Sequence, residues 1–143
     1  MKKLMKSKLI PLLAATTLMW VMVGATPSTV LASGSEHHVR AAIVAVGGSG
    51  VGGYVNIVQM PGDEGGSRIQ VVATGLQPGE EYVSLYYDNS TCDLPGDELG
   101  AYTGNAGGIG TTGGRIDDDL DEVDSVSVRV AGTLELLGCA DTH

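Results

Sequence analysis

The stretch Ser125-Val126-Ser127-Val128-Arg129-Val130 alternates polar and apolar side chains with a period of two. Successive side chains of a β-strand point to opposite faces of a sheet, so this pattern predicts a strand whose valines face a core. No segment after residue 32 keeps apolar residues at helical spacing over ten residues. The chain is therefore expected to be all-β.

Short runs rich in Val, Ile, Thr and Tyr lie before and after this stretch, separated by clusters of Gly, Pro and Asp that favour turns. Glycine-rich segment 47–53 has no following Lys-Ser or Lys-Thr pair and precedes a predicted strand, so it is interpreted as a hairpin turn and not a phosphate loop. Eight short strands in one domain, residues 39–143, indicate a sandwich or flattened barrel. The expected strands are Val39–Val46, Tyr54–Gln59, Arg68–Thr74, Glu81–Tyr87, Leu99–Thr103, Gly108–Arg115, Ser125–Ala131 and Thr133–Leu137.

The N-terminal residues have the pattern of a signal peptide. Four lysines lie within residues 1–8, an apolar run covers residues 9–25, and small polar residues follow. Cleavage after Ala32 is the simplest interpretation, cleavage after Gly34 is a second, and an uncleaved membrane anchor is the alternative. The prediction is a signal peptide at residues 1–32, a flexible mature N-terminus at 33–38, and a secreted or extracytoplasmic domain, in the periplasm or at the cell surface.

The mature chain is strongly acidic. All lysines lie in the predicted signal peptide, which leaves four arginines against 17 acidic residues and a net charge of −13. Such a charge disfavours nucleic acid and anionic membrane surfaces as partners. It is expected to keep the domain soluble, or else to attract cations or basic partners.

Cys92 and Cys139 are the only cysteines. Because exported proteins meet oxidising conditions, the two are expected to form a disulfide. Two free thiols, or part of a metal site, are the alternatives.

Several segments together resemble the copper/zinc superoxide dismutases. Gly50–Gln59, GVGGYVNIVQ, is similar to the first hairpin of that family, and the turn at Thr74–Glu80 resembles its G-L-x-x-G motif. The next strand leads to Cys92, as the family's copper-binding strand leads to its first cysteine, and Cys139 lies near the C-terminus, as the second does. The resemblance covers residues 40–141 and implies an eight-stranded Greek-key sandwich.

The residues that give the family its chemistry are replaced. Where the copper-binding H-x-H pair belongs, the chain has Ser84 and Tyr86, and near the place of a later copper histidine it has Arg129. Leu136 stands where the resemblance implies an anion-guiding arginine, and the loop after the first cysteine contains no zinc-binding histidines. Dismutase chemistry needs copper held by imidazoles, so neither enzyme activity nor a copper or zinc cofactor is expected.

Three weaker candidates remain. If cleavage follows Gly34, the new amine and His37 would suit Cu(II) or Ni(II) in a square plane, whereas a solvated end is the alternative. The acidic run containing Asp117, Asp119 and Asp121 suggests calcium, although it lacks EF-hand spacing and fits a solvated loop. Tyr86, together with the tyrosine at i−4 on the same face, forms either core filling or a small binding patch.

The sequence is therefore interpreted as an exported, non-catalytic, superoxide dismutase-like module with a structural or interaction role, whose partner is an unknown protein or cell-surface component. The alternative is an extracytoplasmic metal-binding protein, with copper as the metal, or a residual dismutase-type redox protein. An unrecognised type of enzyme is a third class, which no motif supports.

Overall fold

The computed structural model describes residues 37–143. The predicted signal peptide at 1–32 and residues 33–36 of the predicted flexible N-terminus lie outside the described residues. The first strand begins at His38, one residue before the predicted start of the domain. Among the described residues, no helix has the length and apolar character needed to cross a membrane.

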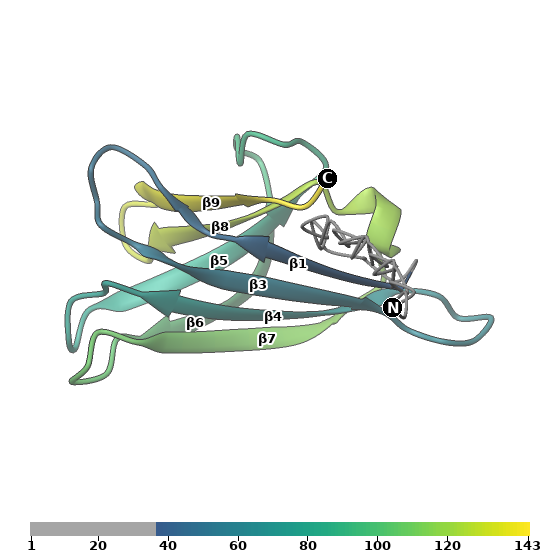
Figure 1. The fold of residues 1–143 in the computed structure, drawn as a ribbon, viewed down its shortest axis with the longest axis horizontal. Coiled ribbons are helices and arrows are strands. Elements are labelled where there is room, and N and C mark those ends of the chain that lie inside the picture. The colour runs from purple at the N-terminus through teal and green to yellow at the C-terminus, as the bar shows by residue number, and fades with distance from the viewer. Residues whose placement is uncertain (1–36) are drawn as a thin grey trace, which may run out of the picture. The chain divides into compact units, whose positions relative to one another are not determined.

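The described chain forms two antiparallel β-sheets, arranged as a sandwich (Figure 1). The first sheet has the order β1-β3-β4-β7, and the second has the order β2-β9-β8-β5-β6. Residues 37–143 contain one helical segment, the 3-10 turn η1 (Leu120–Glu122). The strands are β1 (His38–Ala42), β2 (Val44–Ala45), β3 (Gly52–Gln59), β4 (Ser67–Thr74), β5 (Glu81–Tyr87), β6 (Asp97–Thr103), β7 (Gly110–Ile116), β8 (Ser125–Val130) and β9 (Leu136–Asp141).

The predicted strand Val39–Val46 is divided between the two sheets. Its first part, β1, pairs with β3, and its second part, β2, pairs with β9. The division falls at Ile43, whose backbone nitrogen donates a 3.0 Å hydrogen bond to Gly53 and whose side chain is buried. One continuous segment therefore joins the edges of the two sheets.

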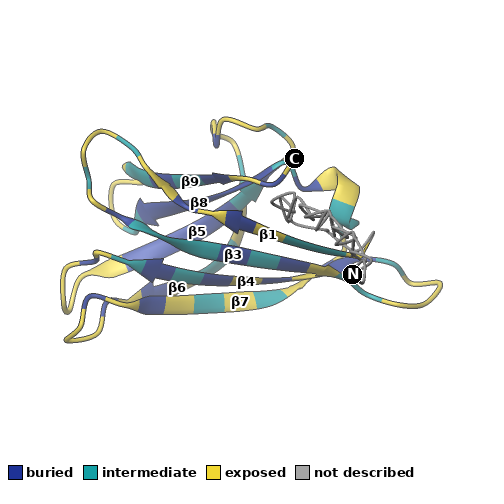
Figure 2. Cartoon of the chain, viewed as in Figure 1, coloured by how far each residue is buried: buried dark blue, intermediate teal, exposed yellow. Residues whose placement is uncertain are grey.

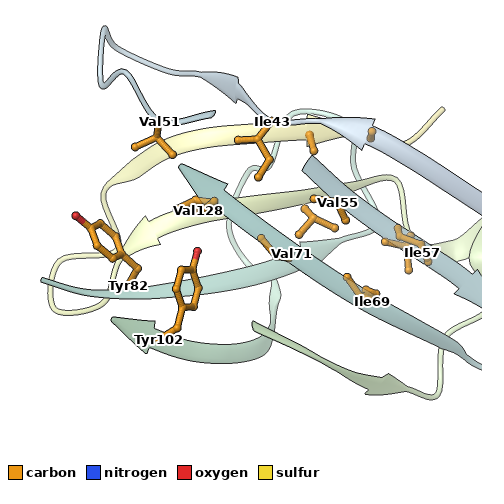
Figure 3. Packing of buried hydrophobic residues seen from close by; sticks show 14 of the residues in the cluster. Ile43, Val51, Val55, Ile57, Ile69, Val71, Tyr82, Tyr102 and Val128 are labelled. Atoms are coloured by element: carbon orange, nitrogen blue, oxygen red, sulfur yellow. The ribbon is translucent and has the colours of Figure 1, made fainter. Parts of the chain in front are cut away.

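The main core lies between the sheets (Figure 3). The first sheet contributes Val55, Ile57, Ile69 and Val71, all fully buried, and β8 of the second contributes the predicted core valines at 126 and 128. Burial of a valine or isoleucine side chain stabilises a fold by about 1.5–3 kcal/mol, so this cluster is a major source of stability.

The outer face of the second sheet is also covered. Val83, Leu85 and Tyr87 of β5 form a second buried cluster with Cys92, which belongs to the loop at residues 88–96. We call this segment the Cys92 loop. Because it lies over the sheet, the polar face of β8 is buried as well, and Figure 2 shows β8 buried along most of its length.

The predicted disulfide is present and joins the Cys92 loop to β9, with a Cα–Cα distance of 6.0 Å between Cys92 and Cys139. The last strand differs from its prediction, because β9 begins at Leu136, whereas the prediction placed the strand at Thr133–Leu137. Residues 131–135 form a tight turn closed by a 2.8 Å hydrogen bond from the Leu134 nitrogen to the Val130 carbonyl. We call this segment the β8–β9 turn.

Glycine is required at one position inside β3. Gly53 has φ +117°, and a Cβ atom there would lie 1.9 Å from the carbonyl oxygen of Val72 on the neighbouring strand. The hairpin turn predicted at residues 47–53 is shorter in the structure, because β3 already begins at Gly52.

Candidate functional site

The predicted site positions on β5 face the interior of the sandwich. Ser84 is fully buried, and its Oγ atom lies 3.0 Å from the hydroxyl of Tyr102. The hydroxyl of Tyr82 accepts a 2.8 Å hydrogen bond from the backbone nitrogen of Gln77. Ser84 and Tyr102 satisfy each other inside the core, and the Tyr82 hydroxyl finds its partner at the edge of the core, as buried polar groups require.

Tyr86 has a different environment from Tyr82. It is half-buried, packs against the main core and also lines a surface cavity described below. Tyr82 therefore fills the core, whereas part of the Tyr86 side chain is accessible from the surface cavity.

Arg129 does not share a face with Ser84 and Tyr86. In the register of β5 with β8, Ser84 is opposite Val128, whereas Arg129 is opposite Val83. Neighbouring register positions point to opposite faces, so Arg129 lies on the outer face of the second sheet, beneath the Cys92 loop. The resemblance implied that Ser84, Tyr86 and Arg129 share a former metal site. The structure places Arg129 on the opposite face of the sheet from the other two.

The Arg129 guanidinium is held by a buried network. Its Nε atom donates to the hydroxyl of Tyr87 at 2.8 Å, and that hydroxyl lies 2.8 Å from Ser127 Oγ. Nη2 donates to the carbonyl of Cys92 at 2.6 Å, and Nη1 donates to the carbonyl of Leu134 at 2.5 Å. Within residues 37–143 the guanidinium forms no salt bridge, although Arg129 is only 5% exposed.

The two carbonyls that Arg129 binds belong to residues with unusual backbone angles. Cys92 has φ +57° and Leu134 has φ +58°, and they are the only non-glycine residues with positive φ in the described part of the chain. A left-handed conformation costs a non-glycine residue about 1–2 kcal/mol. The hydrogen bonds from Arg129 offset this cost and fix the Cys92 loop and the β8–β9 turn in place.

An apolar groove lies between these two fixed segments, with a volume of about 500 Å³. Its floor is formed by Val83 and Leu85, one wall by Leu94 of the Cys92 loop, and the other by Leu134 of the β8–β9 turn. The two wall leucines are 51% and 40% exposed, so apolar surface is accessible to a ligand.

An acidic cavity of about 600 Å³ adjoins the groove. Pro95 and Gly96 line both, so one short backbone segment separates them. Burial raises the pKa of Tyr86 to about 12, and the nearby Asp118 acts in the same direction. Six carboxylates line the cavity: Asp88, Asp97, Asp118, Asp121, Glu122 and Asp124.

The structure separates the carboxylates of the predicted calcium loop. Asp119 accepts hydrogen bonds from the Gly66 nitrogen at 2.8 Å and from Gln59 Nε2 at 2.7 Å, which lower its pKa. Asp119 therefore links the connection between β3 and β4 to the η1 turn. Asp121 lines the acidic cavity and Asp117 does not. Between residues 37 and 143, no group of three His, Cys, Asp or Glu side chains has an arrangement that could hold a metal ion.

The histidines lie at the ends of the described chain. His37 is exposed, and its carbonyl accepts a 2.8 Å hydrogen bond from the Gln59 nitrogen. The other ligands of the expected amine-and-imidazole site, at residues 35 and 36, lie outside the described residues. Nε2 of His143 lies 3.0 Å from Oδ1 of Asp124 at the acidic cavity.

Sequence reasoning missed both the Arg129 network and the groove. Two acceptors of Arg129 are backbone carbonyls, which leave no trace in residue type, and the acidic cavity collects side chains from β5, β6 and the η1 region.

Comparison of the sequence with protein-family models and with curated proteins finds no match.

Proposed function

We propose that this chain is an exported, non-catalytic protein with a superoxide dismutase-like sandwich, and that it acts as a structural or interaction module. The order of strands in the two sheets and the disulfide between the loop after β5 and the last strand are consistent with the fold of that family. The replaced ligands support the absence of dismutase chemistry, since Ser84 is enclosed in the core and Arg129 is occupied by its network.

The observation that carries the interaction role is the preformed apolar groove. Two exposed leucines stand on segments that a buried arginine and a disulfide hold in place. A surface that is already ordered loses less conformational entropy when a partner binds, which favours recognition. Accessible apolar surface of this kind is typical of sites that bind another molecule.

The non-catalytic part is tested by metal content. The exported protein, purified without an affinity tag or chelator, is expected to contain far less than stoichiometric copper or zinc and to keep its Tm in EDTA. Near-stoichiometric copper with a Tm that falls in EDTA would instead favour the metal-binding or residual redox alternative.

The interaction role is tested by cross-linking in intact producing cells. A photoreactive residue in place of Leu94 is expected to give a discrete cross-linked product in the extracytoplasmic fraction. The matched position is Val44, which is 66% exposed on β2 and does not line the groove. Cross-links of equal yield from both positions, or none from either, would count against an interaction module.

A further inference from the structure

We propose that the apolar groove and the acidic cavity form one docking surface for a polypeptide segment in which an apolar side chain lies next to lysine or arginine side chains. This inference rests on the proposed interaction role and names the chemistry of the partner.

The groove and the cavity are close enough for one ligand to occupy both. Gly96 lies against the ring of Tyr87, and a Cβ atom at this glycine would lie 2.3 Å from the ring's Cε1 atom. Gly96 and its neighbour Pro95 line both depressions, so the groove and the cavity meet along this segment. An apolar side chain in the groove would place the neighbouring residues of an extended segment over the cavity.

Apart from His143, whose Nε2 atom lies 3.0 Å from Oδ1 of Asp124, the described residues place no basic side chain at the acidic cavity. Residues 37–143 contain no lysine, and none of their arginines lines either depression. Arg40 stacks on Tyr54, Arg115 pairs with Glu64, and Arg129 is buried. A cationic partner would pair with these carboxylates, and such charge complementarity favours its recognition.

The groove distinguishes a peptide from a simple cation. Leu94 and Leu134 would gain nothing from a metal ion or a polyamine, whereas an apolar side chain would cover both. Glu98 lines the groove as well, so the negative potential extends over the apolar surface. A ligand that is both apolar and cationic matches the two depressions, and the charge pairs at the rim add specificity and salt dependence.

The proposal is tested with the purified mature protein and a short fluorescent peptide, acetylated and amidated, that has a leucine followed by lysines. Saturable binding at low ionic strength, weakened by added salt, is expected. Replacing the leucine by serine, or the lysines by glutamine, is expected to lower the affinity at least about fivefold each. A leucine-free peptide that binds equally well would reveal a plain cation site, and a lysine-free peptide that binds equally well would reveal a plain apolar site; either result overturns the proposal.

Protein variants locate the binding. Leu94→Ser is expected to weaken the peptide about tenfold, and Asp118→Asn combined with Glu122→Gln about threefold to tenfold. The matched controls are Val44→Ser and Asp63→Asn. Both residues are exposed and line neither depression, so these variants are expected to bind the peptide as the wild-type protein does. Each variant's Tm is measured, and a loss of affinity counts only where the Tm is kept; Leu134→Asn provides a second groove variant if Leu94→Ser unfolds.

The outcome separates this inference from the proposed function. If no peptide binds, or if calcium or spermine displaces the peptide regardless of its leucine, the docking surface is refuted. Cross-linking through Leu94 in intact cells would then still support an interaction module with another kind of partner.

Discussion

The disulfide is expected to supply much of the stability of this domain. It joins Cys92 to Cys139 across 47 residues of chain. In the chain-entropy model, closing a loop of that length destabilises the unfolded state by about 4 kcal/mol. Because small domains are stable by only about 5–15 kcal/mol, the variant with both cysteines changed to alanine should lose a large part of its free energy of unfolding.

Urea unfolding at equilibrium, followed by tyrosine fluorescence and circular dichroism, measures this loss. The midpoint should fall strongly, and the slope should rise, since the unfolded chain without the cross-link exposes more surface. The wild-type protein under a reducing agent provides the control, because it loses the cross-link and keeps both sulfur atoms in the buried cluster. A loss below about 1 kcal/mol in both samples would refute the reasoning.

Three further predictions follow from single side chains. Arg129→Met should cost about 3–5 kcal/mol of unfolding free energy, because the buried Cys92 carbonyl, the part-buried Leu134 carbonyl and the Tyr87 hydroxyl lose their donor. Arg129→Lys should not restore that loss, since one ammonium cannot replace the planar guanidinium; urea unfolding measures both variants. Gly53→Ala should lower stability by at least about 2 kcal/mol, and a Tm equal to that of wild type would contradict the clash with the Val72 carbonyl. Because the folded pKa of Tyr86 is raised from 10.0 to about 12, its contribution to stability should be complete below pH 10 and lost as pH rises to about 12. Tyr86→Phe should remove that loss, which urea unfolding as a function of pH measures.

The strands follow from local sequence to different degrees. Tyrosines and a valine between two turn segments place β5 at its predicted bounds, Glu81–Tyr87, and alternation puts the valines of β8 in the core. The last strand begins later than predicted and continues through Gly138, whose missing side chain makes room for Ile43. Such a requirement depends on a strand far away in the sequence, so no local pattern reveals it.

The candidate site depends almost entirely on distant contacts. Arg129 stands in the polar half of an alternating pattern, which predicts an exposed side chain, yet the Cys92 loop buries it. The acidic run at 117–124 was visible as a charge cluster, but Asp88 and Asp97 join it only through the pairing of β5 with β6. One member of the run, Asp119, leaves the cluster to bind Gly66 and Gln59.

A buried arginine without a carboxylate partner needs a reason, because an apolar residue could fill the same space without the cost of removing a charge from water. Here the reason is geometric. The carbonyls of Cys92 and Leu134 belong to the two segments that form the walls of the groove, and one planar guanidinium reaches both, together with the hydroxyl of Tyr87. The disulfide holds the Cys92 wall to β9 independently of Arg129. Without the disulfide, Arg129 would still bind the Cys92 carbonyl and the Leu134 carbonyl. Without Arg129, the contact that joins the Leu134 wall to the Cys92 loop would be lost, so peptide binding should suffer more from Arg129→Met than from reduction.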